Sequence, residues 1–240
     1  MIYILAAIAV VAAIHYVKSN WRRWRYAKDP VFPDAPKRPD LLYGYFGCTK
    51  DQVAETKGHV NVLVEVQFEP ENTIKHIRES DTVVMLGLSP YILDRPDEKT
   101  KFTVRPDAEQ RLRDHFTALR LAGVLHFVVA LSPIDEPNNT VGDVAELSKA
   151  VGIIRRVAAE YIELSGYKLY VVYAADKAFI GRDLFDWIGF DDYDMKGSVL
   201  TGKQYKELKA SLFPDQKTII IPGGAYGQDP VPFCNYAKAN

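Results

Sequence analysis

Hydrophobic positions alternate between two patterns along most of the chain. From residue 41 onward, short runs of β-branched and aromatic residues are separated by longer amphipathic stretches. The short runs are almost continuously apolar, which is typical of parallel strands covered on both faces. We predict seven strands, at residues 42–46, 60–68, 82–88, 126–131, 169–174, 187–193 and 218–221.

The stretches between these strands have the spacing of helices. In residues 107–122, apolar side chains recur at a period near 3.6, and Pro106 stands before them as a start signal. The longest helix is predicted at residues 140–165, with Thr140 as its cap and Gly166 at its end. Shorter helices are predicted at residues 51–57, 71–79, 177–185 and 202–212.

This alternation predicts an α/β fold of the (β/α)8 TIM-barrel type. A doubly wound sheet is the second choice, and the absence of G-x-G-x-x-G after the first strand counts against a dinucleotide-binding version of it. A complete barrel needs an eighth strand and helix, but the sequence stops at Asn240, just beyond the seventh strand. We therefore expect a barrel that is open or shortened at its C-terminal end.

The first residues differ from the rest. Met1 to Val17 contains no Lys, Arg, Asp or Glu, and about 17 residues make roughly 25 Å of helix, enough for a thin hydrocarbon core. Trp and Arg follow at residues 21–28, as at a headgroup interface. We predict a single-pass membrane anchor at residues 1–17, with residues 2–17 in the bilayer. A cleaved signal peptide and a buried helix are the alternatives.

The anchor prediction divides the chain into three parts: the anchor (1–17), a basic and proline-rich linker (18–40) and a barrel domain (41–240). The side of the membrane stays open. Lys18 to Lys28 is basic, which would keep the domain in the cytoplasm, whereas a glycan-cleaving enzyme belongs outside it.

Composition excludes several classes. The 240 residues carry 30 Lys and Arg against 31 Asp and Glu, a formal net charge of −1, so a nucleic-acid partner is not expected. Cys48 and Cys234 are the only cysteines and fit no metal spacing. No phosphate-loop or dinucleotide motif is present, and we predict neither a cofactor nor a resident metal.

Polar side chains collect where the predicted strands end, which is where barrel enzymes place their chemistry. Carboxylates, amides and tyrosines dominate this set, a mixture that suits a sugar because tyrosine faces pack on its ring and the polar groups bind its hydroxyls. The candidates for catalysis are Glu136, Asp194, Asp192 and Glu65. The candidates for substrate binding are Tyr45, Gln67, Asp135, Asn138, Tyr173, Asp176, Tyr193 and Tyr226.

One stretch in this set has a family resemblance. Asp135-Glu136-Pro137-Asn138, after the predicted fourth strand, resembles the Asn-Glu-Pro signature of the large barrel clan of retaining glycoside hydrolases. The resemblance implies a glycosidase barrel in which Glu136 is the general acid/base, with Asp135 in place of the usual Asn. That clan has a nucleophilic Glu after the seventh strand, where this sequence reads Ile221-Pro222-Gly223-Gly224.

A weaker resemblance points to chitinase-type barrels, which use a substrate acetamide as the nucleophile. It lies in Phe190-Asp191-Asp192-Tyr193-Asp194, which is similar to their Met-x-Tyr-Asp stretch. Such a mechanism would need no carboxylate on the seventh strand. Their Asp-x-x-Asp-x-Asp-x-Glu motif is missing before Glu136, where only Asp135-Glu136 matches its end.

Three functional hypotheses follow. The first is a membrane-anchored glycoside hydrolase acting on a polysaccharide or cell-wall glycan, with Glu136 as proton donor. The second is a non-catalytic carbohydrate-binding or interaction barrel derived from such a fold. The third is a metal-dependent hydrolase using Asp191, Asp192 and Asp194, against which the lack of paired His ligands counts.

Overall fold

The computed structural model describes residues 42, 44–47, 53, 57, 58, 60–66, 69–94, 101–140, 143–174, 179–192 and 203–222. All of them belong to one compact unit, Pro36–Asn240. The predicted anchor and linker lie outside these ranges. Among the residues described, no helix has the length and apolar character needed to span a bilayer.

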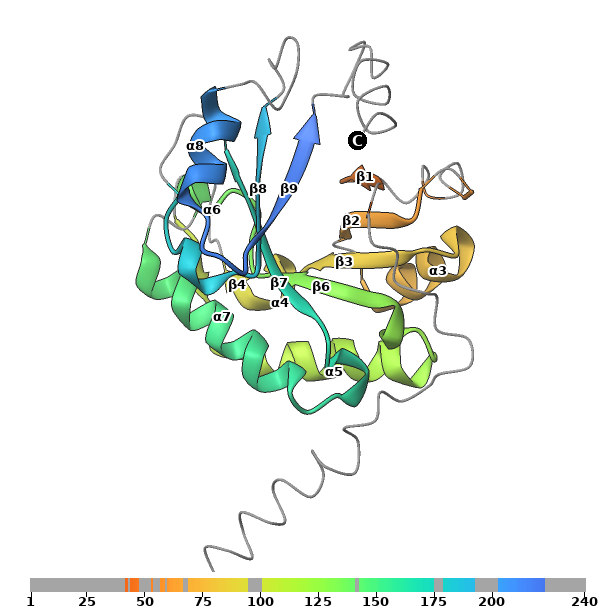
Figure 1. The fold of residues 1–240 in the computed structure, drawn as a ribbon. Coiled ribbons are helices and arrows are strands. Elements are labelled where there is room, and N and C mark those ends of the chain that lie inside the picture. The colour runs from red at the N-terminus through yellow and green to blue at the C-terminus, as the bar shows by residue number, and fades with distance from the viewer. Residues whose placement is uncertain are drawn as a thin grey trace, which may run out of the picture. The chain divides into compact units, whose positions relative to one another are not determined.

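A parallel sheet of seven strands forms the centre of the fold (Figure 1). Every neighbouring pair of strands is parallel, and the order across the sheet is the order along the chain. The seven predicted strands are confirmed, each to within two residues at either end. They are β1 (Gly44–Phe46), β2 (Val62–Val66), β3 (Val83–Gly87), β6 (Val128–Ser132), β7 (Lys168–Ala174), β8 (Trp187–Asp192) and β9 (Lys217–Pro222).

This strand order decides between the two predicted folds. A doubly wound sheet starts in the middle and reverses direction, so its strands cannot lie in simple chain order. The sheet observed here winds in one direction and curls as it does so, giving a half-barrel of the TIM type (Figure 1). The described residues contain no eighth strand of this sheet, in agreement with an incomplete barrel.

Helices follow the strands and cover the outer face of the sheet. The main ones are α3 (Pro70–Ser80), α5 (Ala108–Leu121), α7 (Val144–Ala158) and α8 (Lys203–Ser211). In α5, Leu112, Phe116 and Leu119 are fully buried, and their spacing of three and four residues places them on one face of the helix. The predicted helices at 71–79, 107–122 and 202–212 are therefore confirmed. Of the one predicted at 51–57, only residues 53 and 57 are described.

Two helix predictions are corrected. The helix predicted at 140–165 begins later, because the Asp143 side chain caps it by accepting a hydrogen bond from the Ala145 amide, 2.8 Å away. Thr140 instead ends the short helix α6 (Pro137–Thr140), and the chain leaves α7 at Ala158 for a 3-10 turn, Ile162–Leu164. In the region predicted as a helix at 177–185, the described residues 179–185 form only a 3-10 turn, Arg182–Leu184.

A short insertion after β3 was not predicted. It consists of α4 (Ser89–Ile92) and an antiparallel pair, β4 (Leu93–Asp94) with β5 (Thr103–Val104). Elements of two to four residues are too short to show a hydrophobic period, so the sequence contains no signal for them.

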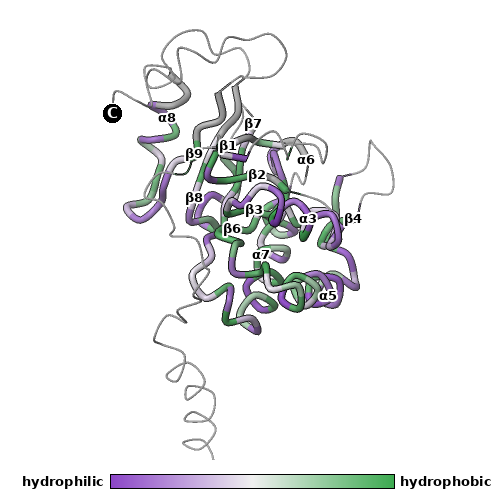
Figure 2. The backbone as a smooth tube through the Cα atoms, turned by 90° about the vertical axis from the view of Figure 1, so that its right-hand side faces the viewer, coloured by the Kyte–Doolittle hydropathy of each residue, from purple (hydrophilic) through white to green (hydrophobic). Residues whose placement is uncertain are grey.

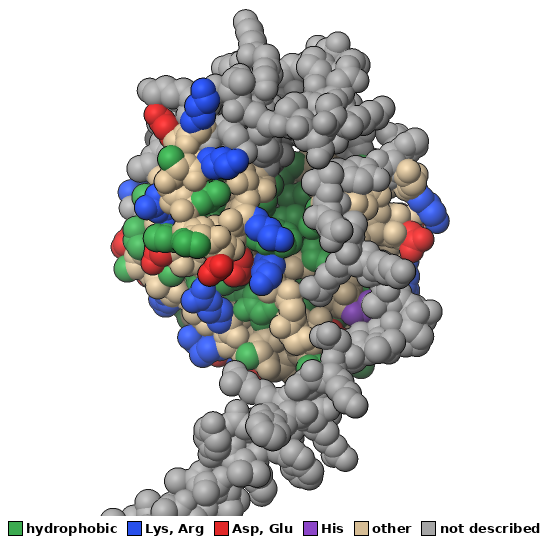
Figure 3. Space-filling view, in the orientation of Figure 1, with side chains coloured by type: hydrophobic (Ala, Val, Ile, Leu, Met, Phe, Trp, Pro, Cys, Tyr) green, Lys and Arg blue, Asp and Glu red, His purple; other side chains and the backbone are tan. Residues whose placement is uncertain are grey.

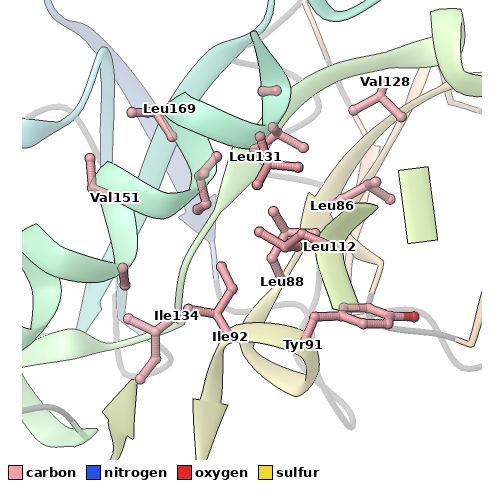
Figure 4. Packing of buried hydrophobic residues seen from close by; sticks show 14 of the residues in the cluster. Leu86, Leu88, Tyr91, Ile92, Leu112, Val128, Leu131, Ile134, Val151 and Leu169 are labelled. Atoms are coloured by element: carbon pink, nitrogen blue, oxygen red, sulfur yellow. The ribbon is translucent and has the colours of Figure 1, made fainter. Parts of the chain in front are cut away.

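Two hydrophobic layers hold the sheet in place. The larger layer lies between the sheet and the helices, and Figure 4 shows part of it. The smaller contains strand residues without any from a helix, among them Val64, Met85, Tyr170 and Val172, and it fills the concave side of the curl. Figure 2 shows that the described strands are mostly hydrophobic, whereas hydropathy is mixed along the helices. Both faces of the sheet are thus buried, as the continuous apolar runs predict.

His115 makes the stability of this packing depend on pH. The side chain is 2% exposed, its ring centroid lies 4.2 Å from that of Tyr91, and its Nδ1 has no hydrogen-bond partner. Burial lowers the pKa of His115 from 6.5 to about 4. Between these values the unfolded chain binds a proton that the folded chain excludes, so the free energy of unfolding falls as the pH drops through this window.

We predict that His115 accounts for a loss of about 2–3 kcal/mol between pH 7.5 and pH 4.5. Urea unfolding of the wild type and of His115→Phe at pH 7.5 and 4.5 measures this loss. Carboxylates titrate in both proteins, so the difference between their pH dependences isolates His115. Equal pH dependence in the two proteins would show that His115 is not responsible.

Candidate functional site

The carboxyl ends of the strands share one edge of the curled sheet, as in any all-parallel sheet. The fourth strand in the order, β6, ends there at Ser132. It is followed directly by Pro133, Ile134, Asp135 and Glu136, and then by α6. The Asp-Glu-Pro-Asn stretch therefore follows the fourth strand of the sheet, as predicted.

Three contacts fix the turn between β6 and α6, which we call the Glu136 turn (residues 132–136). The hydroxyl of Ser132 donates to the carbonyl of Ile134, with 3.0 Å between the oxygens. Ile134 is 2% exposed and belongs to the helix-side core, where Figure 4 labels it. The amide of Glu136 donates to the carbonyl of Val172 on β7, 2.9 Å away.

The last contact extends the sheet beyond its regular ladder. The β6–β7 ladder pairs Ala130 with Lys168 and Leu131 with Leu169, whereas β7 continues to Ala174. The amide of Glu136 therefore gives a hydrogen-bond partner to the carbonyl of Val172, which lies beyond Leu169, the last residue of β7 that pairs with β6. The turn is held against the fifth strand at the edge where a barrel would bind its substrate.

Glu136 has an unusual backbone conformation. Its φ is +47°, and only Asp81 among the other described non-glycine residues also has a positive φ. Asp81 ends helix α3, where a left-handed residue is common. Glu136 ends no helix, and a residue with a β-carbon pays about 1–2 kcal/mol for this conformation. A strained residue at a strand end marks a candidate functional position.

The turn brings together three of the predicted site residues. Asp135, Glu136 and Asn138 are each half-buried, and Pro137 between them is buried. One carboxylate oxygen of Asp135, Oδ1, is buried completely. Two carboxylates and an amide thus lie within four consecutive residues at the carboxyl edge of the sheet.

For the other predicted residues the structure gives only partial placement. The backbones of Tyr45, Glu65 and Asp192 lie in β1, β2 and β8, and the structure does not describe their side chains. The remaining predicted residues, Gln67, Asp176, Tyr193, Asp194 and Tyr226, lie outside the described ranges.

Tyr173 lies on the helix side of the sheet. Its side chain is fully buried in the helix-side core, its ring packs edge-on against Phe179, and its hydroxyl donates to the carbonyl of Ile180. Burial also raises the pKa of this phenol above its ordinary value. Tyr173 does not reach the concave side, so we leave it out of the proposed substrate-binding set.

Two described residues near this edge were not identified from the sequence. Phe46, the last residue of β1, is partly buried and packs against the concave layer, so it offers an aromatic surface at the carboxyl end of the first strand. The alternation of side chains along β1 could have indicated it. Ser132 is the second, and its hydrogen bond within the turn has no signal in the sequence.

A depression lies on the helical surface, between the start of α5 and α7. It encloses about 430 Å³, and its lining includes Arg105, Arg113, Lys149 and Arg156. Each of these cations is paired with an acidic side chain of the same surface: Asp94 and Asp107 for Arg105, Glu109 and Glu160 for Arg113, Glu146 for Lys149, and Glu109 for Arg156. Because its charges compensate one another, this depression is a weaker candidate than the Glu136 turn.

A metal site finds no support in the part of the chain that the structure describes, where no three His, Cys, Asp or Glu side chains come close enough to hold an ion. The three aspartates of the metal-dependent hypothesis lie outside this part of the chain or have side chains that are not described. The side chains of Asp191 and Asp192 are not described, and Asp194 lies outside the described ranges.

Comparisons with known proteins bear on the fold of this chain. No protein-family profile matches the chain, and no curated protein matches it. Among solved structures, the FMN-binding β-glucuronidase of Faecalibacterium prausnitzii L2-6 is similar with a TM-score of 0.51 and 12% identity, over 78% of this chain and 31% of the glucuronidase. This chain is thus similar in fold to a part of that protein.

Two further structures are similar at lower scores. The mannanase BCman of Bacillus subtilis matches with a TM-score of 0.46 and 15% identity, over 86% of this chain and 79% of the mannanase. A fungal β-1,4-galactanase matches with a TM-score of 0.40 and 11% identity, over 59% of this chain. The chain spans 54% of that galactanase and 22% of a Bacteroides uniformis β-glucuronidase. At these identities the comparisons show the fold alone, and a barrel-type fold is what the sequence predicted.

The strain at Glu136 can be measured without any activity assay. Replacing Glu136 by Gly or by Ala removes the same side-chain contacts, but only Gly adopts φ +47° without steric cost. We predict that Glu136→Gly is more stable than Glu136→Ala by about 1 kcal/mol in urea unfolding.

The matched control is Glu79, near the end of helix α3. There the order should reverse, with Glu79→Ala more stable than Glu79→Gly by up to about 1 kcal/mol. If the Ala variant were also the more stable of the two at position 136, the left-handed conformation would be wrong.

Proposed function

We propose that this protein hydrolyses glycosidic bonds of a polysaccharide or cell-wall glycan, with Glu136 as the general acid. The observation that carries the proposal is the placement of Glu136: a half-buried carboxylate in a strained turn, directly after the fourth strand of a glycosidase-like sheet. Barrel enzymes place their reacting groups at this edge of the sheet.

The chemistry of glycoside hydrolysis matches this site. The carboxylic acid of Glu136 would transfer its proton to the glycosidic oxygen as the bond from that oxygen to the sugar carbon breaks. A second group must then stabilise the oxocarbenium-like sugar or activate the water that adds to it. We assign that role to Asp194 or Asp192, with Glu65 assisting.

Substrate binding would use the polar and aromatic residues around the same edge. Asp135, in the turn, would accept hydrogen bonds from sugar hydroxyls, and Asn138, at the start of α6, would both accept and donate them. Phe46 adds an apolar ring at the carboxyl end of the first strand. The other proposed contacts are Gln67, Asp176, Tyr193 and Tyr226.

The end of the seventh strand restricts the mechanism. Strand β9 ends at Pro222, and the sequence continues with Gly223 and Gly224, none of which carries a carboxylate. A covalent intermediate on a glutamate at this position is therefore not available to the chain. Water activated by an aspartate of the sixth-strand end, or an acetamide of the substrate itself, fits the residues better.

Replacing Glu136 by Gln tests the assignment, because the amide keeps the shape and cannot deliver the proton. Release of reducing ends from a panel of soluble polysaccharides is the assay. For a glycan that the wild type cleaves, we expect kcat of Glu136→Gln to fall by about 10²–10⁴-fold with KM little changed.

The matched control for this experiment is Glu79→Gln, since Glu79 is a carboxylate on α3, away from the strand ends, and it forms an i,i+4 ion pair with Lys75, at 3.6 Å. It should keep wild-type kcat. Undiminished hydrolysis by Glu136→Gln would exclude Glu136 as the proton donor.

A second function is favoured by the missing carboxylate after β9. A barrel that has lost one of its two reacting groups can still bind glycans without cleaving them. Under this alternative, the wild type and Glu136→Gln bind the same oligosaccharide with equal affinity in calorimetry, and neither releases reducing ends during prolonged incubation.

We also propose that residues 1–17 anchor the barrel to a membrane, because they carry none of the four charged residue types and precede a Trp- and Arg-rich segment. The full chain should sediment with membranes and require detergent for release. A variant that lacks residues 2–17 should stay in the supernatant. A full chain that alkaline carbonate washes off the membrane would contradict a spanning anchor.

A further inference from the structure

We infer that Ser132 is a positioning residue, whose hydroxyl keeps the Glu136 turn in the strained conformation that presents the Glu136 carboxylate. The catalytic part of this inference rests on the proposed function. Its structural part does not, because the strain at Glu136 can be read from stability alone.

Ser132 is joined to the structure on two sides. It is fully buried, and its carbonyl accepts a hydrogen bond from the Leu88 amide, 2.8 Å away, just beyond the end of β3. Its hydroxyl donates to the Ile134 carbonyl at 3.0 Å. The residue thus ties the start of the turn to the neighbouring strand and to the middle of the turn itself.

The hydroxyl bond restrains the segment that leads to Glu136. Ile134 has its side chain in the helix-side core and its carbonyl bound to Ser132. Two residues later, the Glu136 amide must reach the Val172 carbonyl on β7. Because the Ile134 carbonyl and the Glu136 amide are both held in place, the backbone between them has little freedom, and Glu136 takes φ +47°. Strain of this kind persists only where the surrounding contacts over-determine it.

Loss of the hydroxyl would remove one of these restraints. In Ser132→Ala, the Ile134 carbonyl loses its hydrogen-bond donor. The backbone from residue 134 to residue 136 can then rotate, so that residue 136 takes a negative φ. The strain at position 136 would then relax, and the carboxylate would move from its place at the sheet edge. The alternative is that the Ile134 carbonyl merely gives the buried hydroxyl of Ser132 a hydrogen-bond partner. In that case, replacing Ser132 would leave the backbone conformation of residue 136 unchanged.

A double-mutant cycle separates these two possibilities. With Ser132 present, the folding equilibrium constant of Glu136→Gly should be about fivefold larger than that of Glu136→Ala, because Gly tolerates the left-handed conformation. In the Ser132→Ala background this ratio should fall to about one or below. Ser132→Thr keeps the hydroxyl and should keep the ratio. An unchanged ratio in Ser132→Ala would overturn the inference.

Kinetics test the catalytic part on the glycan that the wild type cleaves. Ser132→Ala should lower kcat by about 10- to 100-fold with KM within about twofold, since a proton donor displaced by an ångström loses rate rather than binding. Ser132→Thr should recover most of the loss. Full kcat in Ser132→Ala, or no recovery in Ser132→Thr, would overturn the positioning role.

Two further points keep this experiment decisive. If Ser132→Ala does not fold, Ser132→Cys takes its place, since it keeps the volume and weakens the hydrogen bond. If the wild type cleaves no glycan, the proposed function fails, and the stability cycle alone still supports or overturns the structural role of Ser132.

Discussion

The hydrogen bond from the Glu136 amide to the Val172 carbonyl is the contact on which the candidate site depends. It attaches the end of the fourth strand to the fifth strand beyond their regular ladder, at a residue whose backbone is left-handed. Without it, the Asp-Glu-Pro-Asn stretch would be an ordinary surface loop after a strand. With it, a carboxylate is held at the edge where parallel sheets of this kind gather reacting groups.

The rest of the fold explains why that edge is well defined. Seven parallel strands in chain order can curl in only one sense when each connection is right-handed, and curling produces a concave side that needs its own apolar filling. Val64, Met85 and Val172 supply it, while the helices bury the opposite face. Figure 3 shows that, in the view of Figure 1, hydrophobic side chains are also visible at the centre, with Lys and Arg along their left side.

The strands could be predicted because a sheet buried on both faces leaves an unmistakable continuous apolar run. The ends of the helices were harder to predict. The helix expected to start at Thr140 instead starts after Asp143, and the sequence does not distinguish the two because Thr and Asp both cap helices well. The face of the sheet on which a strand side chain lies could not be predicted either. Along β7, Tyr173 lies on the helix side, whereas Tyr170 and Val172 lie on the concave side. Only the pairing of β7 with both neighbouring strands determines which of these two sets of side chains faces the concave side. The conformation of Glu136 depends on Val172, 36 residues further along, so no local pattern contains it.

Amide hydrogen exchange at Glu136, followed by NMR, tests most directly whether this turn is fixed as described. The account predicts that the Glu136 amide is protected about as strongly as the strand amides of β7, although it lies outside any helix or strand. Lys101, an exposed residue outside any helix or strand, provides the reference for a fast amide. Exchange of Glu136 at the rate of Lys101 would mean that the bond to Val172 does not persist, and the account of the site would be contradicted.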